Sequence, residues 1–503
     1  MELGLIVEMA VTEDPDRVAV TDVDGAALTR SELQRRAQGA AASFLRAGAR
    51  QVGFLAPNGR TLPITLFGAA LAGRPFVPLN YRWADEQLSD VLSREPGLIV
   101  VASPEAENRL ANLGWRATIP ERHLLDDTAM APDLLLVDPD EIAVLLYTSG
   151  TTGAPKAAVL RHRHLTSYVV STMEFGSAGP EDAALVSVPP YHVAGVASIL
   201  SNLYAGRRIV YLDTFDEHRW LELVRREQAT HAMVVPTMLA RIVDAMDHAE
   251  ADVSSLRSVA YGGAKIPERV ITKALERFPH VRFTNAYGLT ETSSTIAMLG
   301  PKDHRAALAS EDPAVRARLR SAGRPVPGVE VAIVDETGEP CPPGVVGDIV
   351  VRGPQVSGEY VDADPGEPGS WFVTRDRGWL DEQGYLFVEG RADDTIIRGG
   401  ENIAPAEIEE VLLRHDHVAD CAVVGVSDEE WGQRIAAAVV LVPDGRADAD
   451  ELREWVRRHL RTSKTPDVIE LWSSLPYNPM GKLLRREVQA SLTGTKAGAG
   501  PDE

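Results

Sequence analysis

Residues 147–156 read YTSGTTGAPK and directly follow an apolar run, IAVLL, at residues 142–146. The apolar run predicts a short buried strand, and the hydroxyl residues and glycines after it predict a turn or loop. Glycine lets the backbone fold closely round a ligand, and hydroxyl groups and a lysine donate hydrogen bonds to phosphate oxygens. The common P-loop has a different spacing, because here Lys156 follows Gly153 by three residues and Ala157 comes next. The stretch therefore predicts either a polyphosphate cradle of another kind or a Gly/Thr-rich hairpin turn.

The composition is that of a globular protein with an acidic surface. The chain has 503 residues, of which 44% are hydrophobic and 25% charged, and its formal net charge is −22. This length allows about two to four domains. A strongly negative chain disfavours a nucleic-acid partner, and any anionic ligand must be held by local donors.

The cysteines and the apolar segments indicate the compartment. Cys341 and Cys421 lie far apart and form no metal or disulfide pattern, which favours a reducing environment. Residues 1–15, MELGLIVEMAVTEDP, lack a basic leader, so we do not expect a signal peptide. The longest apolar runs, such as residues 64–73, fall short of the roughly 20 residues that span a bilayer. We expect a cytoplasmic protein without an integral membrane segment.

Helical and strand patterns alternate through the first half of the chain. Residues 29–48, TRSELQRRAQGAAASFLRAG, begin with a capping residue, show amphipathic spacing and end at glycine, which predicts a helix. Such alternation predicts an α/β fold with a largely parallel sheet covered by helices. Further helices are expected at 62–72, 85–94, 164–172, 218–227 and after 235 through 246, and strands at 51–55, 75–79, 97–102, 183–188, 208–212 and 231–235.

The pattern changes at about Gly323, where short strands alternate with Gly/Pro-rich turns. Strands at 329–334, 347–352 and 385–388 predict an antiparallel β subdomain. After a break at 390–394, a small α+β domain is expected, with helices at 404–414 and 449–460 and strands at 421–426 and 435–442. We therefore divide the chain into a large domain at 1–391, a small domain at 392–492 and a disordered tail at 493–503.

Two further motifs lie in the large domain. Residues 261–267, YGGAKIP, follow an expected strand end at 256–260, and paired glycines there allow a flat base to approach the main chain. A tight strand-to-helix turn is the simpler interpretation of this motif taken alone. In residues 285–292, NAYGLTET, Tyr287 offers a flat ring and Glu291 a hard carboxylate suited to Mg²⁺. This second motif is also a modest signal by itself.

Five segments in this order and spacing resemble the adenylate-forming superfamily of acyl-CoA synthetases and related adenylating enzymes. The resemblance runs from about Thr29 to Arg486 and rests on YTSGTTGAPK, YGLTET, VTRDRGWL, GRADDTIIRGGENIAPAEIE and PMGKLLR. It implies a large N-terminal domain of helix-covered sheets with a β subdomain, followed by a small, mobile C-terminal α+β domain. It also implies ATP, Mg²⁺ and coenzyme A as co-substrates and cofactors.

The resemblance assigns the nucleotide site residue by residue. The phosphate loop would wrap the β- and γ-phosphates, Gly262–Ala264 would contact adenine, Tyr287 would stack on it, and Asp376 would accept from the ribose hydroxyls. The full set of implied ATP and AMP contacts is Thr148, Ser149, Gly150, Thr151, Thr152, Gly153, Lys156, Gly262, Gly263, Ala264, Asn285, Ala286, Tyr287, Gly288, Asp376 and Arg391.

The same resemblance implies the catalytic groups. Lys482 would be the catalytic lysine, Glu291 the Mg²⁺ ligand and Thr290 a contact of the α-phosphate, while His192 would border the substrate carboxylate and the thiol channel. Asp393 would be the hinge on which the small domain turns. The loop for the CoA step would comprise Arg398, Gly399, Gly400 and Glu401. Composition alone favours plainer interpretations: a surface turn at Gly481–Lys482, a hairpin loop at 399–402 and a charged turn at 374–376.

Small apolar residues follow the histidine in PPYHVAG. The implied acyl pocket contains His192, Val193, Ala194, Gly195 and Val235, which predicts a roomy apolar pocket for a medium-length, branched or polycyclic acid. The pocket-forming segments 193–197, 233–238, 260–264 and 287–295 contain no arginine to pair with a second carboxylate, so a dicarboxylate is disfavoured. Lys265 is the one charge nearby, and we expect that it could face solvent.

Two positions depart from the family pattern. Position 157 is usually glycine in the phosphate loop and is alanine here, and position 375 is usually glycine and is arginine here. If the backbone at Arg375 requires a positive φ, the arginine is strained there. Alternatively, Arg375 adds a phosphate or solvent contact.

These inferences predict an ATP-dependent carboxylate–CoA ligase. The acid and ATP would give acyl-AMP and pyrophosphate, and the CoA thiol would then give acyl-CoA and AMP. One alternative is an adenylating enzyme that loads a carrier-protein phosphopantetheine. Histidine at position 192, where amino-acid activators generally have aspartate, disfavours an amino acid. A non-catalytic nucleotide-binding homologue is disfavoured by the presence of Lys156, Glu291, Asp376 and Lys482 together. A homodimer is left open.

Overall fold

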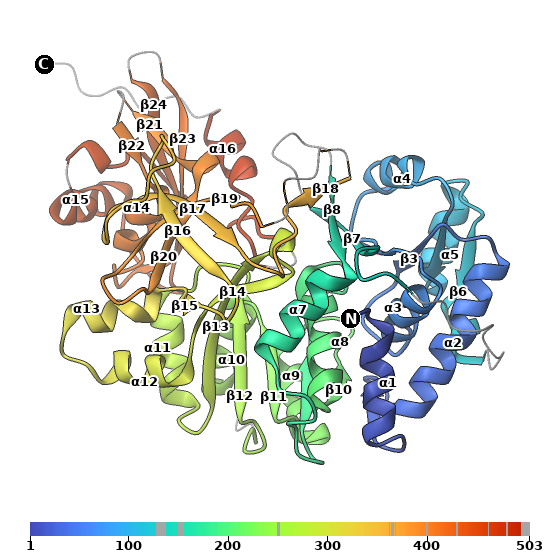
Figure 1. Ribbon diagram of the computed structural model, residues 1–503. Coiled ribbons are helices and arrows are strands. Elements are labelled where there is room, and N and C mark those ends of the chain that lie inside the picture. The colour runs from blue at the N-terminus through green and yellow to red at the C-terminus, as the bar shows by residue number, and fades with distance from the viewer. Residues whose placement is uncertain are drawn as a thin grey trace, which may run out of the picture.

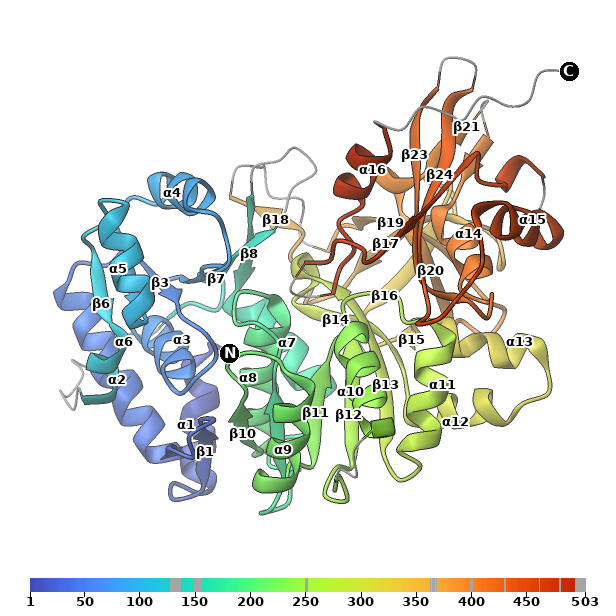
Figure 2. The same cartoon turned by 180° about the vertical axis from the view of Figure 1, so that it is seen from behind.

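The computed structural model describes residues 1–126, 137–148, 155–248, 252–361, 363, 367, 369–398, 401–428, 431–460, 462–478 and 481–493. In Figure 1 the seven-stranded sheet lies on the right and the nine-stranded sheet at the lower centre, and the C-terminal region, orange to red, is at the upper left. Figure 2 gives the same arrangement from behind. Among the described residues, no helix combines the length and the apolar character that crossing a membrane requires.

The first large sheet has nine strands. The central strands from β1 to β13 are parallel, and the strands at both edges pair antiparallel. In spatial order the strands are β15 (Arg324–Pro325), β14 (Ser294–Leu299), β13 (Arg282–Leu289), β12 (Ser258–Gly262), β11 (His231–Val234), β9 (Ala183–Val186), β10 (Arg208–Tyr211), β1 (Val18–Thr21) and β2 (Ala27–Thr29).

The second large sheet has seven strands and carries the two ends of the phosphate-loop motif. Its strands β6 to β7 are parallel, whereas β8 and β18 add antiparallel at one edge. Their order is β18 (Glu359–Tyr360), β8 (Lys156–Arg161), β7 (Ile142–Thr148), β4 (Phe76–Pro78), β3 (Gln51–Leu55), β5 (Leu98–Ala102) and β6 (Thr118–Pro120).

Helices fill the space between the two sheets. One hydrophobic cluster contains buried side chains of both sheets and of these helices, so the two sheets share a core. Burial of such apolar area is the main stabilising term of the fold. The helices of this layer are α1 (Gly4–Glu13), α2 (Arg30–Arg46), α3 (Thr61–Leu71), α7 (His162–Thr172) and α8 (Val193–Ala205).

The outer faces of both sheets are covered by further helices. α4 (Asp85–Arg94) and α5 (Pro104–Asn112) pack on the seven-stranded sheet, with α6 (Glu121–Asp126) following them in the chain. The nine-stranded sheet packs against α9 (Glu217–Glu227), α10 (Pro236–His248), α11 (Glu268–Arg277) and α12 (Pro301–Ala309), and the short α13 (Pro313–Arg316) follows.

The β subdomain and the small domain are separate layers. β16 (Glu330–Val334), β17 (Gly347–Arg352), β19 (Phe372–Leu380) and β20 (Leu386–Arg391) form an antiparallel sheet. The small domain packs α14 (Pro405–Leu412) and α15 (Ala449–His459) on one face of its sheet and α16 (Arg485–Thr493) on the other. Its strands are β21 (Ile396–Arg398), β22 (Glu401–Ile403), β23 (Val418–Asp428), β24 (Gly432–Leu441) and β25 (Val468–Trp472).

The predicted α/β architecture is confirmed. Helix α2 is an example of an element that begins at the capping residue indicated by the sequence. The Thr29 hydroxyl accepts from the Glu32 amide while the Glu32 carboxylate accepts from the Thr29 amide, a reciprocal capping box. Three local features go beyond the predicted elements. Helix α1 at the N-terminal apolar stretch was not among them, and β12 extends through Gly262, two residues beyond the expected strand end. Residues 374–376 lie in strand β19, so the plainer interpretation of a charged turn does not hold there.

The N-terminal segment is held by a histidine of α7. The Leu3 amide donates to His162 Nδ1 at 3.1 Å, and burial lowers the pKa of His162 to about 4. Because the bond requires a neutral ring, the unfolded chain binds the proton more readily than the folded chain between pH 6.5 and 4.

We expect the free energy of unfolding to fall by up to about 1.4 kcal/mol per pH unit from His162 alone as the pH falls through this window. Denaturant unfolding of His162→Asn, which keeps an acceptor but does not titrate, measures this contribution. The variant should show a shallower acid limb than the native chain, and identical limbs would contradict the assignment.

Candidate functional site

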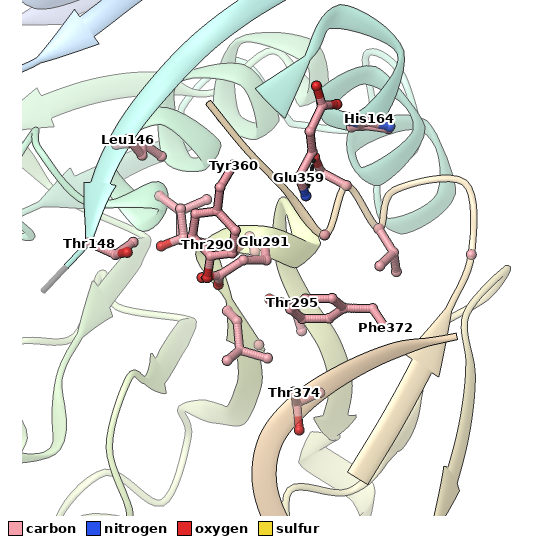
Figure 3. Close-up of a pocket in the computed structure, with 18 of the residues that line it drawn as sticks. Leu146, Thr148, His164, Thr290, Glu291, Thr295, Glu359, Tyr360, Phe372 and Thr374 are labelled. Atoms are coloured by element: carbon pink, nitrogen blue, oxygen red, sulfur yellow. Dashed lines mark hydrogen bonds between the residues drawn. The ribbon is translucent and has the colours of Figure 1, made fainter. Parts of the chain in front are cut away.

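A cavity of about 1710 Å³ lies where the two large sheets, the β subdomain and the small domain meet. Figure 3 shows part of its lining, with Thr290, Glu291 and Tyr360 close together and Thr148 on the neighbouring strand. Of the residues expected in the site, the structure places these on its wall: Thr148, Lys156, His192, Val193, Ala194, Gly263, Ala286, Gly288, Thr290, Glu291, Arg391 and Lys482.

The two ends of the phosphate-loop motif meet at the cavity. Thr148 ends β7 and Lys156 begins β8, and the two are paired in the antiparallel ladder. The Thr148 hydroxyl donates to the Lys156 carbonyl at 3.4 Å. Of the residues expected to bind phosphate, Ser149, Gly150, Thr151, Thr152 and Gly153 lie outside the described residues.

A buried hydrogen-bonded group lies directly behind the cavity wall. The Tyr287 hydroxyl donates to Asp376 Oδ2 at 2.6 Å, and Arg391 Nη1 donates to Asp376 Oδ1 at 2.9 Å. Burial, followed by the nearby Asp376 charge, raises the pKa of Tyr287 well above its usual value, so the phenol stays a donor. The family resemblance implies contacts of Tyr287 and Asp376 with different parts of a nucleotide. It does not predict the hydrogen bond between the two side chains.

The glycines of the two adenine-type motifs are required by neighbouring backbone. A Cβ at Gly262 would overlap the carbonyl oxygen of Ala286, and a Cβ at Gly288 would overlap that of Ser294. Gly263 has a φ of +87°, a conformation that glycine adopts without strain. Close strand packing alone therefore accounts for Gly262 and Gly288. Asn285 is in β13, where its side chain donates to the Ser321 carbonyl, and Ala264 comes directly after Gly263.

Glu291 is the buried carboxylate of the site, with 8% of its surface exposed. The Tyr360 hydroxyl donates to Glu291 Oε1. No group of three or more histidine, cysteine, aspartate or glutamate side chains in the described part of the chain could hold a metal ion. Mg²⁺ is commonly bound by one or two carboxylates together with substrate phosphates and water. A single carboxylate on the wall of a cavity large enough for ATP fits that mode of binding.

His192 stands at the N-terminal end of α8 and beside the apolar part of the wall. Burial lowers its pKa to about 4, so the ring is neutral at physiological pH. Its ring contacts that of Tyr191 at 4.7 Å between centroids. Tyr191, Met233 and Leu289 also line the cavity and were not among the predicted pocket residues. Val235 and Gly195 lie behind the wall, since neither lines the cavity.

Arginines line the cavity from segments that were not among the predicted pocket-forming segments. Arg161 pairs with Glu359 at 2.7 Å, and Arg352 pairs with Glu330 at 2.6 Å. Arg375 has a φ of +62°, so the arginine occupies a conformation that favours glycine, as the conditional expectation stated. Its exposed side chain lines the cavity. Ala157, the second departure from the family pattern, is buried in β8.

Lys482 brings the small domain to the cavity. Its turn is closed by the Asn478 amide, which donates to the Lys482 carbonyl at 2.9 Å. Gly481, with a φ of +67°, lies so close to Thr237 of the large domain that a Cβ would overlap the Thr237 side chain. The close fit of this turn against α10 directs Lys482 to the wall that also contains Glu291.

Ion pairs join the two domains beside this turn. Glu410 of the small domain pairs with Arg320 and, at 3.8 Å, with Lys265. Lys265 is 45% exposed, so it faces solvent in part, but its charge is matched by the small domain. Arg269 also donates to the carbonyl of Ala419.

The described residues that were expected for the second step, Asp393, Arg398 and Glu401, are not among those that line the cavity. Arg398 ends β21, pairs with Glu401 across the β21–β22 hairpin and donates to Asp467 Oδ1 at 2.8 Å. Asp393 lies in the short 3₁₀ segment between β20 and β21. Gly399 and Gly400 lie outside the described residues.

A large domain that presents a buried carboxylate, and a small domain that presents a lysine to the same cavity, define an adenylate-forming enzyme. The AMP-binding enzyme family matches residues 7–361, and the AMP-binding enzyme C-terminal domain matches residues 407–482. The chain belongs to the AMP-binding enzyme family.

Relatives extend this assignment over nearly the whole chain. The feruloyl-CoA synthase of an Amycolatopsis species is 36% identical over 92% of this chain and 94% of its own length. The fatty acid–[acyl-carrier-protein] ligase ScoC of Streptomyces coeruleorubidus is 33% identical over 94% of this chain and 93% of its own. The o-succinylbenzoate coenzyme A synthetase of Bacillus subtilis, solved with ATP and a magnesium ion, has a TM-score of 0.81 and 27% identity, covering 96% of this chain and 98% of its own.

The family and these relatives establish the class of reaction. The chain is an AMP-forming acid–thiol ligase that uses ATP with Mg²⁺ and coenzyme A. The predicted enzyme class and its cofactors are confirmed. The family and the relatives do not establish which acid the enzyme activates. The residues that line the cavity are the best guide to its chemical class.

Proposed function

We propose that this chain activates a medium-length, branched or polycyclic apolar carboxylic acid and transfers it to coenzyme A. One observation carries the proposal: Lys482 of the small domain lines the same cavity as Glu291 and the His192 wall of the large domain. An acid on that wall would share the cavity with Thr148 and Lys156, the described ends of the phosphate loop, and with Lys482.

In the first step the acid carboxylate attacks the α-phosphate of ATP, and pyrophosphate leaves. Lys156 and the loop after Thr148 hold the departing phosphates, and Asp376, fixed by Arg391 and Tyr287, holds the ribose hydroxyls. Lys482 supplies positive charge where negative charge grows on phosphorus. Glu291 would hold Mg²⁺ together with the phosphates, and the bound ion would supply further positive charge. Neutral His192 borders the carboxylate without adding a charge.

In the second step the thiol attacks the acyl-AMP carbonyl, and AMP leaves. The small domain turns at Asp393, withdraws Lys482 and brings the loop at 398–401 to the cavity. Glycines suit the passage of a thin pantetheine arm, and rotation about a few residues is a known route to such gating. The ion pairs of Glu410 with Arg320 and Lys265 would break in this turn.

The wall beside His192 supports an apolar acid. Val193, Ala194, Met233 and Leu289 line the cavity there, and none of them carries a charge. The arginines Arg161 and Arg352 are already paired with Glu359 and Glu330, so neither is a ready partner for a second carboxylate. Feruloyl and o-succinylbenzoate, the acyl groups for which two relatives are named, each contain a benzene ring, which such a wall accommodates.

A panel of acids tests the substrate class. Pyrophosphate release is measured with ATP, Mg²⁺, CoA and each acid, and products are identified by mass. We expect aromatic and medium-chain acids to exceed acetate and malonate in kcat/KM by about 10-fold or more, since each buried methylene contributes about 0.8 kcal/mol. Preference for acetate or malonate would contradict the proposed pocket.

The same experiment decides between the two thiol acceptors. Acyl-CoA as the product supports the proposal. Acyl-AMP that accumulates in the presence of CoA would favour a carrier-protein phosphopantetheine, the acceptor for which the relative ScoC is named. Addition of a phosphopantetheinylated carrier would then discharge the adenylate.

A further inference from the structure

Tyr360 contacts the proposed metal ligand from strand β18, which has no part in the two proposed steps. Its hydroxyl donates to Glu291 Oε1, and Figure 3 shows the two side chains directed at each other. The amides of Ser357 and Gly358, in the same segment, donate to the Glu291 carbonyl at 2.8 and 3.1 Å. Segment 357–360 therefore holds Glu291 by both its main chain and its side chain.

The strand of Tyr360 also holds one end of the phosphate loop. β18 pairs antiparallel with β8, with Tyr360 opposite Ala158. The Val361 amide donates to the Ala157 carbonyl at 3.0 Å. Ala157 follows Lys156, the residue at which the phosphate loop ends. One short strand thus connects the loop expected at the pyrophosphate to the carboxylate expected at the metal.

The Tyr360 hydroxyl holds one oxygen of the buried Glu291 carboxylate. Among the described residues, Tyr360 is the side chain recorded as donating to the Glu291 carboxylate. A carboxylate oxygen accepts, so the Tyr360 hydroxyl is the donor of this bond. Hydrogen bonds to a charged group are stronger than neutral ones, so this contact restricts the rotation of the carboxylate.

We infer that Tyr360 is a positioning residue for the Mg²⁺ ligand Glu291 and sets its place relative to the phosphate loop. The inference rests on the proposed role of Glu291. Tyr360 is not itself a ligand in this assignment. Its hydroxyl orients the Glu291 carboxylate before the ion and ATP bind, so the binding site is preorganised.

Tyr360→Phe removes the hydroxyl and keeps the ring. Mn²⁺ is the probe, titrated by electron paramagnetic resonance into the enzyme saturated with a non-hydrolysable ATP analogue. We expect the Mn²⁺ Kd to rise about 10-fold, the loss of one hydrogen bond to a charged group. Binding of the analogue without a divalent ion should be unchanged.

Tyr385→Phe is the matched control. The Tyr385 hydroxyl also donates to a carboxylate, Asp303 Oδ1 at 2.7 Å, but neither residue lines the cavity. This variant should bind Mn²⁺ like the native chain. A general loss of folding in Tyr360→Phe would appear as a lowered Tm. If folded Tyr360→Phe binds Mn²⁺ with the same Kd as Tyr385→Phe and the native chain, the inference is overturned.

A second comparison separates a positioning role from other effects. If Tyr360 acts through Glu291, Tyr360→Phe should change the Mn²⁺ Kd little when Glu291 is already glutamine. Equal effects in both backgrounds would contradict the inference. Failure of the native enzyme to bind Mn²⁺ with the nucleotide, or no weakening by Glu291→Gln alone, would instead contradict the proposed role of Glu291.

Discussion

Replacing Lys482 by alanine is expected to lower the rate of acyl-adenylate formation by about 10²–10³-fold, the effect of removing one preorganised charge-stabilising group. Thioester formation from supplied acyl-AMP should stay close to the native rate. The physical reason is that Lys482 reaches the cavity from the small domain and adds charge only while phosphorus is attacked. ATP–pyrophosphate exchange measures the first step, and single turnover of acyl-AMP with CoA measures the second.

The fold should tolerate the change, because Lys482 is exposed. Its free energy of unfolding is expected to stay within about 0.5 kcal/mol of the native value. Lys302→Ala, an exposed lysine on α12 outside the cavity, is the control and should leave both steps unchanged. Equal loss of both steps in Lys482→Ala would argue against a lysine that serves adenylation alone.

Replacing Asp376 by alanine should have the second large effect. It leaves the Tyr287 hydroxyl and Arg391 Nη1 without the acceptor that they now share. Because Arg391 keeps 32% of its side chain exposed, we expect a loss of about 2–3 kcal/mol in the free energy of unfolding, below the range for a fully buried pair. Loss of the ribose acceptor should raise the ATP Kd by about 10²-fold.

Equilibrium unfolding and calorimetric ATP titration measure the two effects separately. Asp348→Ala is the matched control, since Asp348 lies in the same β sheet, is 40% exposed and stands 3.9 Å from Arg377. An exposed pair of this kind contributes about 0–1 kcal/mol. An unchanged ATP Kd in a folded Asp376→Ala protein would remove Asp376 from the nucleotide site.

Periodicity and capping predicted most of the architecture, because these signals are local. The helix at α2 follows from Thr29 and Glu32, and the strands β3, β7 and β17 follow from short apolar runs. The N-terminal helix α1 was missed, because its apolar residues show little periodicity. Strand β19 was missed as well, since it contains Arg375 with a positive φ and its charged residues resemble those of a surface turn.

The sequence by itself determined the family, the class of reaction and the identity of the main polar groups, because motif spacing is a property of the chain alone. The loop at Tyr147–Lys156, the carboxylate Glu291 and the lysine Lys482 could be named without coordinates, and the family resemblance assigned them to one nucleotide. The packing of sheets and domains is what brings Thr148, Lys156, Glu291 and Lys482 to one cavity across long stretches of chain.

Tertiary structure alone decided which groups touch. It placed the Tyr360 hydroxyl on Glu291, joined Tyr287 and Arg391 through Asp376, and matched Glu410 with charges of the large domain. Such contacts depend on the distance and direction between side chains from different elements. A linear pattern records which groups are present, and only the folded chain fixes how they face one another.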